Sequence, residues 1–550
     1  MVMEALQDDE LAKADIALQE QLAEERGPWE TTWRMIDDRF PDGAGGFSAA
    51  SPGMIRGERN FDPTHITALE RFAAAGVAIT TPENEQYIRP RFADPELQKL
   101  RSVQLWCQEA GQRLYDIRHA ARTGFSVAAN EDWDQLGRYG TSPMWADVQP
   151  GAVGLFYRTL HLSTCWIDTD FAGLVDTVVR KLCMPVRHFE KMFSMEALTP
   201  KMIKALEDNK PQTEFEVLHF VMPNTKWDRE ALDWRRNPIA SRYLAVDEKM
   251  YLRRGGYTSM PISVSRHTTS PGEKYGRSPG IKMLPSINGV NAMRHTTLRA
   301  GHKAVDPALL FADDGGVTKL VTRPGGLNPG MVDDNGRPLV SRMPGGEGAL
   351  PYAMQDIEQE RGTIRTAFLE EFYKILTDPN SRMTTTEVLE VMSKQGILVR
   401  PFAGRYAMEK QQPVSTRDLD LAMQYKQIKP FPPEVLEAGA WPMIDYENPL
   451  AAMARAEATS KTLRFVEAIT PLANVDDGAV LDYLDTDEMV PGMAAEIGVK
   501  PSYIRSKDQV AAIRKARAQA QQESMAIEQL GTAADAYQKI AKGNQISEMA

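Results

Sequence analysis

The chain has 550 residues, of which 42% are hydrophobic and 25% charged, and its formal net charge is −11. This composition is typical of a globular protein, and the length predicts roughly three or four domains or sub-domains. The excess of acidic residues argues against a protein that binds nucleic acid tightly by neutralising its phosphates. It does not exclude a protein along which nucleic acid moves without tight binding.

No stretch of the sequence is long and apolar enough for a transmembrane helix, so we expect no membrane association. The first residues lack the basic and apolar pattern of a secretory signal. Three cysteines are too few for a disulfide framework, which predicts a protein that matures in a reducing compartment.

The sequence lacks the local patterns of the common catalytic and cofactor sites. The glycine cluster Gly272–Gly280 has no Gly-Lys-Ser/Thr at a helix start, so it is not a phosphate-binding P-loop. The eight histidines never form the His-Glu-x-x-His pattern of helical zinc proteases. Asp168 and Asp170 are spaced to share a metal ion, but their place between apolar runs favours a hairpin turn. We therefore predict no catalytic, cofactor-binding or metal-binding residues.

Helices are predicted over much of the N-terminal part. A polar, acidic helix is expected over 4–40, and a second over Pro63–Ala75, where Gly76 ends it. From Asp94 to Phe125 apolar residues recur every three or four positions, which predicts one amphipathic helix of roughly 30 residues. Its apolar stripe is expected to face the core.

Short strands separated by Gly, Pro and Asp are predicted between about 126 and 268. A helix near Pro185–Phe193 interrupts them. The expected strands are Met144–Val148, Gly154–Leu160, Cys165–Asp168, Thr213–Met222, Ser241–Val246 and Met250–Arg253. The fold class that follows is α+β, mostly helical.

The region 285–395 is predicted to contain two helices separated by a long insert. A helix is predicted over Ser286–Ala304 and another over Pro351–Leu376. Between them, Asp306–Leu350 is rich in Gly and Pro, with β-like pieces at Val317–Thr322 and Pro338–Ser341. An irregular insert of this length is usually an interaction element or disordered.

A short turn follows the second of these helices, and more helices are expected to the C-terminus. The turn is Thr377–Arg382, and the next helix begins at Thr384. Ser506 and Gln509 have the spacing of a capping box for a helix over Lys507–Ala541. That tail is poor in large apolar residues, so it either packs against copies of itself or frays.

Several motifs resemble those of one known family. The first comprises Gly272, Glu273, Lys274, Tyr275, Gly276, Arg277, Ser278, Pro279 and Gly280. A second comprises Arg382, Met383, Thr384, Thr385, Thr386, Glu387 and Val388, and further patches are Gly140–Thr141, Asp176–Arg180 and Ile444–Ala451. Their order from about residue 60 to 520 is similar to that of head-to-tail connector (portal) proteins of podovirus-type tailed bacteriophages.

The resemblance implies the phage portal fold, with a wing, a stem, a clip and a C-terminal helical crown. It also implies the following parts: N-terminal helices and α/β wing 1–285, stem helices 286–305 and 351–376, clip 306–350, tunnel loop 377–383, wing return helices 384–500 and crown helix 501–550.

The implied function is that of a passive conduit. The resemblance implies a homo-oligomeric ring, dodecameric by analogy, at one capsid vertex of the virion, assembled in the host cytoplasm. Double-stranded DNA is packaged and ejected through such a ring. The implied partners are the large terminase subunit, which is the ATPase of the packaging motor, the major capsid and scaffolding proteins, and tail adaptor proteins.

By the same analogy, some side chains would face the tunnel and its DNA. The candidates are Arg365, Lys374, Asp378, Asn380, Ser381 and Arg382. The three basic residues among them could equally be solvated helix-end charges or members of ion pairs between subunits.

Two other classes of protein stay open on the sequence. One is another virion structural protein, such as a tail or adaptor component. The other is an enzyme with a dispersed site on carboxylates such as Asp168 and Asp170.

Overall fold

The structure is a computed structural model, and it forms two compact units. The first contains Met1–Ile88 and Arg113–Ile428, and the second contains Arg89–Gln112 and Lys429–Ala550. The residues that the structure describes are 2–41, 46–48, 54, 57–83, 86–148, 154–311, 320–323, 325–332, 335–343, 350–370, 403–446, 465, 467, 468, 485–497, 499, 503–506 and 508–525. No helix within these ranges is long and apolar enough to cross a membrane.

An antiparallel five-stranded sheet, in the order β4-β5-β6-β7-β8, dominates part of the first unit. Its strands are β4 (Cys165–Thr169), β5 (Val175–Pro185), β6 (Glu214–Pro223), β7 (Ile239–Ala245) and β8 (Met250–Tyr257). Four of these strands were predicted from the sequence, whereas β5, one of the central strands, was not. The prediction of an α+β fold is confirmed.

Helices pack against both faces of this sheet. On one face, Val217 of β6 contacts a cluster that includes Phe189 of α6 (Val186–Met192) and Met202 of α7 (Pro200–Glu207). The next residue, Leu218, points to the other face and joins a cluster with Leu22 of α1 (Val2–Arg39). Successive side chains of a strand alternate between faces, so a sheet covered on both sides needs this run of apolar residues.

A second, three-stranded sheet has the order β3-β2-β9. Its strands are β2 (Thr141–Val148), β3 (Leu155–Thr159) and β9 (Ile262–Arg266). It shares an apolar cluster with α5 (Phe125–Arg138) and α12 (Gln412–Gln424), in which Ala129 contacts the same core as Met144 and Val414.

Two helix predictions in this part of the chain were wrong. Helix α2 (Thr64–Thr80) runs through Gly76 instead of ending there. Gly76 is a packing position and not a helix end, because a side chain there would clash with the ring of Trp133. The single helix expected from Asp94 to Phe125 is interrupted twice. Leu100, with φ −66° and ψ 128°, separates α3 (Pro95–Lys99) from α4 (Arg101–Arg118), and left-handed Gly124 precedes α5.

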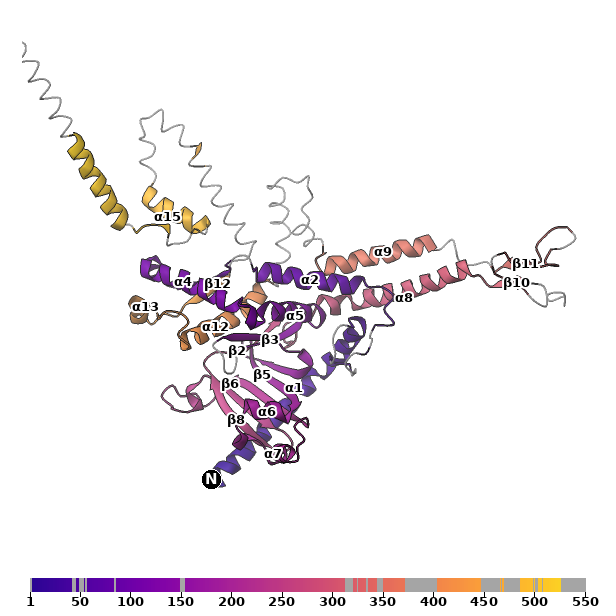
Figure 1. The fold of residues 1–550 in the computed structure, drawn as a ribbon, viewed down its shortest axis with the longest axis horizontal. Helices are drawn as coiled ribbons and strands as arrows, with labels where there is room; N and C mark the ends of the chain where they lie inside the picture. The colour runs from indigo at the N-terminus through magenta and orange to yellow at the C-terminus, as the bar shows by residue number, and fades with distance from the viewer. Residues whose placement is uncertain are drawn as a thin grey trace, which may run out of the picture. The chain divides into compact units, whose positions relative to one another are not determined.

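Two helices of the first unit, α8 and α9, form a hairpin that carries the small sheet β10–β11 beyond its far end (Figure 1). Helix α8 is Pro279–Val305 and begins earlier than predicted, because Ser278 caps it by accepting a hydrogen bond from the Ile281 amide. Helix α9 is Leu350–Ala367, and Leu369 already has a positive φ of 59°. The helix predicted to extend to Leu376 therefore ends earlier than expected, and residues 371–376 lie outside the described ranges.

The strands of the insert are β10 (Leu309–Phe311) and β11 (Val340–Arg342), which pair antiparallel. The strand expected near 338–341 is thus approximately confirmed. The one expected over Val317–Thr322 is wrong where it can be tested, because residues 320–322 are irregular.

In the second unit, aromatic rings form the core around α4 and the chain after Lys429. The ring of Trp106 lies 4.9 Å from that of Phe431 in a tilted arrangement, and its indole N–H donates a hydrogen bond to the carbonyl of Lys429 at 3.0 Å. Strand β12 (Met443–Tyr446) pairs with β1 (Ile88–Arg91), and α13 (Pro433–Ala438) lies between Phe431 and β12 in sequence.

Further helices of this unit are α15 (Thr486–Ile497) and a helical segment over 508–525. The capping box is confirmed, because the Gln509 amide donates to the Ser506 hydroxyl and the Ser506 amide donates to the Gln509 side chain.

Candidate functional site

The motif Gly272–Pro279 is the loop that fixes the start of helix α8. We call it the anchor loop. At Gly276 the loop touches the turn between α5 and β2, where a Cβ on Gly276 would lie 2.2 Å from the carbonyl oxygen of Gly140. The Gly276 amide donates to the Thr141 hydroxyl at 2.8 Å, and the Ser278 hydroxyl donates to the Arg138 carbonyl at 2.6 Å. These contacts explain why both positions of the close approach are glycine.

The other side chains of the anchor loop also have structural partners. Tyr275 is buried, packs edge-on against Trp33 at 5.2 Å, and has its pKa raised by burial. Glu273 and Arg277 pair with each other at 2.5 Å. The Arg277 guanidinium also lies 5.3 Å from the ring of Trp29. The motif is therefore an architectural element that joins α1, β2 and α5 to the start of α8.

Asp168 and Asp170 are part of the same framework. Asp168 pairs with Lys274 of the anchor loop at 2.7 Å. Asp170 closes the β4–β5 turn, because its carboxylate accepts a hydrogen bond from the Leu174 amide at 2.8 Å. The predicted hairpin turn is confirmed. Within the described ranges, no group of His, Cys, Asp and Glu side chains is placed to hold a metal ion.

Arg266 of β9 links three segments from inside the protein. Its guanidinium donates to the carbonyl of Gly173 at 2.6 Å and to the carbonyl of Lys274 at 3.2 Å. It also pairs with Glu409 at 2.6 Å, where both side chains are almost fully buried. The β4–β5 turn, the anchor loop and the segment around Glu409 are thereby held by one cation.

Glu409 belongs to η6 (Ala407–Gln411), a π-helix that precedes α12. The following residue, Lys410, pairs with buried Asp132 of α5 at 2.7 Å and donates to the carbonyls of Ser142 and Ser263 at 3.1 Å each. Burial lowers the pKa of Lys410, and the negative charge of Asp132 opposes that change. The wider turn of a π-helix lets consecutive polar side chains reach different parts of the core.

A further buried ion pair joins α4 to α12. Arg118 and Asp418 are in contact at 2.6 Å with only 1% of either side chain exposed. Arg118 also donates to the Ser415 hydroxyl. Burial raises the pKa of Asp418, and the Arg118 guanidinium opposes that rise. Sequence reasoning missed all of these pairs, because the partners are separated by hundreds of residues and have no local pattern.

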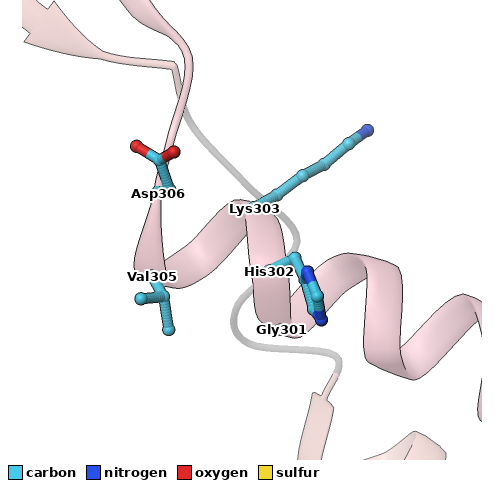
Figure 2. A pocket seen from close by; sticks show the side chains of 5 residues that line it. All are labelled: Gly301, His302, Lys303, Val305 and Asp306. Carbon is cyan, nitrogen blue, oxygen red and sulfur yellow. The ribbon is translucent and has the colours of Figure 1, made fainter.

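The α8–α9 hairpin has a different surface chemistry. Helix α8 contains no Asp or Glu, although the chain as a whole is acidic. Its basic and histidine residues are Lys282, Arg294, His295, Arg299, His302 and Lys303. Figure 2 shows the end of α8, where a hollow is lined by Gly301, His302, Lys303, Val305 and Asp306, and where the Lys303 side chain extends away from Asp306.

Of the predicted tunnel residues, only Arg365 lies within the described ranges. It pairs with Glu358 at 2.8 Å and lies 3.9 Å from Glu370. Lys374, Asp378, Asn380, Ser381 and Arg382, and the motif residues Met383, Thr384 and Glu387, lie outside those ranges. Their role stays a prediction.

Comparison with known proteins identifies the family. The model of the family described as bacteriophage head to tail connecting protein matches residues 12–504. The chain belongs to this family. Members similar to it over nearly their whole length include the probable portal protein of Bordetella phage BPP-1, 26% identical over 94% of this chain and 93% of that protein. The portal protein of Salmonella phage epsilon15 is 24% identical over 96% of this chain and 95% of that protein.

Solved structures add less. A chain from the neck of an empty gene transfer agent particle is 12% identical and aligns over 85% of this connector protein and 93% of its own length. Its TM-score is 0.38, which is too low to show a shared fold.

Proposed function

We propose that this connector protein is the portal of a tailed bacteriophage. The observation that carries the proposal is the family match over residues 12–504, together with portal relatives that align with almost the entire chain. Identical copies would form a ring, about twelve by family analogy, at one vertex of the capsid. Double-stranded DNA would enter and leave the virion through its central tunnel.

The helix–insert–helix order supports an assignment of the parts. Helices α8 and α9 would be the stem, the β10–β11 region between them the clip, and the sheets before α8 the wing. Residues 377–383 would form the tunnel loop, 384–500 the wing return helices and 501–550 the crown. A two-stranded sheet is marginally stable alone. The clip strands would therefore gain stability from pairing with the strands of neighbouring copies.

Charge supports passage without tight binding. Each copy brings a formal charge of −11, so the ring as a whole has the sign of the DNA phosphates. Repulsion from all sides keeps a duplex away from the tunnel wall, so that a motor can push it with little friction. Arg365, Lys374 and Arg382 would offer transient phosphate contacts that slow backsliding.

The partners follow from this role. The chain shows no P-loop pattern, so the energy for packaging would come from a separate ATPase, the large terminase subunit, which would dock on the clip. The ring would contact the major capsid and scaffolding proteins during assembly in the host cytoplasm. After packaging, tail adaptor proteins would take the place of the motor.

Electron microscopy of the purified protein tests the proposal directly. We expect axial views to show closed rings with a central channel, and the number of copies can be counted from their rotational symmetry. Compact single particles without a channel at every protein concentration would overturn the portal assignment.

A further inference from the structure

Two basic side chains near the end of α8 have no acidic partner among the residues that the structure describes. Arg299 and Lys303 are exposed and form no ion pair with any residue in the described part of the chain. They are four positions apart, so they lie on the same face of the helix. In Figure 2 the Lys303 side chain extends away from the Asp306 carboxylate.

Two acidic side chains of α9 are in the same situation. Asp356 and Glu360, also four positions apart, form no ion pair with the residues that the structure describes. Their neighbour Glu358 differs, because it pairs with Arg361 at 3.1 Å and with Arg365 at 2.8 Å. Within the described ranges, the hairpin thus has positive charge without an acidic partner on one helix and negative charge without a basic partner on the other.

The two sets lie at similar heights along the hairpin. Arg299 is six residues before the end of α8, and Asp356 is six residues after the start of α9. At about 1.5 Å per residue, both are roughly 9 Å from the end of the hairpin that carries the clip. Lys303 lies about one helical turn nearer to that end, and Glu360 lies about one turn farther from it.

We propose that Arg299 and Lys303 of one copy pair with Asp356 and Glu360 of the next copy around the ring. The inference rests on the proposed function, and it names the surface that joins neighbouring copies. Rotation about the ring axis moves a copy sideways without changing its height, so only residues at matching heights can meet. Arg299 and Asp356 satisfy that condition at equal heights, and Lys303 and Glu360 extend the two charged patches by one turn in opposite directions. The opposite charges also fix the direction in which the copies follow one another.

Exposed apolar side chains beside these charges supply contact area for the same interface. On α8 they are Leu298, 36% exposed, and Val305, 89% exposed; on α9 they are Tyr352, 73% exposed, and Met354, 57% exposed. An interface typically has an apolar centre with charged residues at its rim. Water-exposed side chains of this size on both helices fit a second copy of the hairpin.

Charge reversal tests the pairing. The variant Arg299→Glu with Lys303→Glu should form at least about tenfold fewer rings at equal protein concentration, because like charges then face each other at every interface. Asp356→Arg with Glu360→Arg should have the same effect. The variant with all four changes should form rings again, because its charges are complementary in the opposite sense.

The readout is the fraction of rings, measured by light scattering after size-exclusion chromatography and by electron microscopy. A matched control is Lys201→Glu with Lys204→Glu on α7, which changes the net charge equally and should leave ring formation unchanged. Circular dichroism establishes that each variant is folded.

The possible failures are distinguishable. If the unmodified protein forms no ring, the proposed function fails. If it forms rings and the Arg299→Glu, Lys303→Glu variant forms them equally well, the interface is wrong while the portal assignment stands. Normal rings that retain less DNA in this variant would instead place the two cations against DNA phosphates, which also overturns the pairing.

Discussion

The interior of the first unit and its α8–α9 hairpin use charge in opposite ways. In the interior, every pair described above is complete within one chain: Arg118 with Asp418, Lys410 with Asp132, and Arg266 with Glu409. On the hairpin, Arg299, Lys303, Asp356 and Glu360 lack partners in the described part of the same chain. A buried charge without a partner is costly, so the ion pairs of the interior have to form when the chain folds. A solvated charge without a partner costs little, so it can remain unpaired until a neighbouring copy binds.

The largest expected effect comes from breaking an interior pair. Lys410→Met keeps a similar side-chain volume but leaves Asp132 buried without a cation. We expect the free energy of unfolding to fall by about 3–5 kcal/mol, measured by urea denaturation with circular dichroism. Replacing both partners, as Lys410→Met with Asp132→Leu, should recover a large part of that loss. An unchanged denaturation midpoint in the single variant would show that the pair is not buried in solution.

A smaller effect is expected at the anchor loop. Gly276→Ala places a methyl group against the Gly140 carbonyl, and neither backbone segment can move without breaking its hydrogen bonds. The expected loss is about 1–3 kcal/mol. The matched control is Gly289→Ala on α8, where nothing lies within 4 Å of the added atom. That change should stabilise the helix by up to about 1 kcal/mol, and equal losses in both variants would contradict the close approach.

A third effect concerns the dependence of stability on pH. Burial lowers the pKa of His267 to about 4, below its ordinary value near 6.5. Between these two values the unfolded chain takes up a proton that the folded protein does not, so stability falls as the pH falls from about 6.5 to 4. The slope is at most about 1.4 kcal/mol per pH unit for one histidine.

His267→Gln should reduce this slope in urea titrations at several pH values. His302→Gln, at an exposed position of the hairpin, is the matched control substitution. A slope that is the same in the unmodified protein and in the His267→Gln variant would contradict the burial of His267.

Local sequence patterns predicted the parts of the fold that local physics determines. The short apolar strands of the two sheets, the two hairpin helices and the Ser506 capping box are examples. The errors at Gly76 and Gly124 have a common cause, because a glycine signals either a helix end or a close packing contact, and only the tertiary neighbours decide which. Trp133 decides it at Gly76. The partners of Lys410 and Arg266 could not be predicted, since each pair joins residues far apart in the sequence.

For the candidate site, the sequence located the anchor loop through its glycines but not its role. The motif residues Tyr275 and Gly276 were recognised by resemblance, and only the structure shows that they fix the start of α8. Arg365 was a tunnel candidate, yet within its own chain it pairs with acids of α9 and just beyond it. The charged residues of α8 and α9 that lack partners in the described part of the chain could be recognised as one surface only once both helices were known to lie side by side.

The joint at Gly140 and Gly276 has a mechanical consequence. Helix α8 has 27 residues and is roughly 40 Å long, and its base is held by the close backbone approach of Gly140 and Gly276 together with the Thr141 and Ser278 hydroxyl groups. We therefore expect a force applied at the tip to be transmitted through this joint to α5 and β2, with little bending at the joint itself. We expect a partner that binds or pushes at the outer end to exert a torque on the region of the two sheets, where Arg266 connects three segments of the chain.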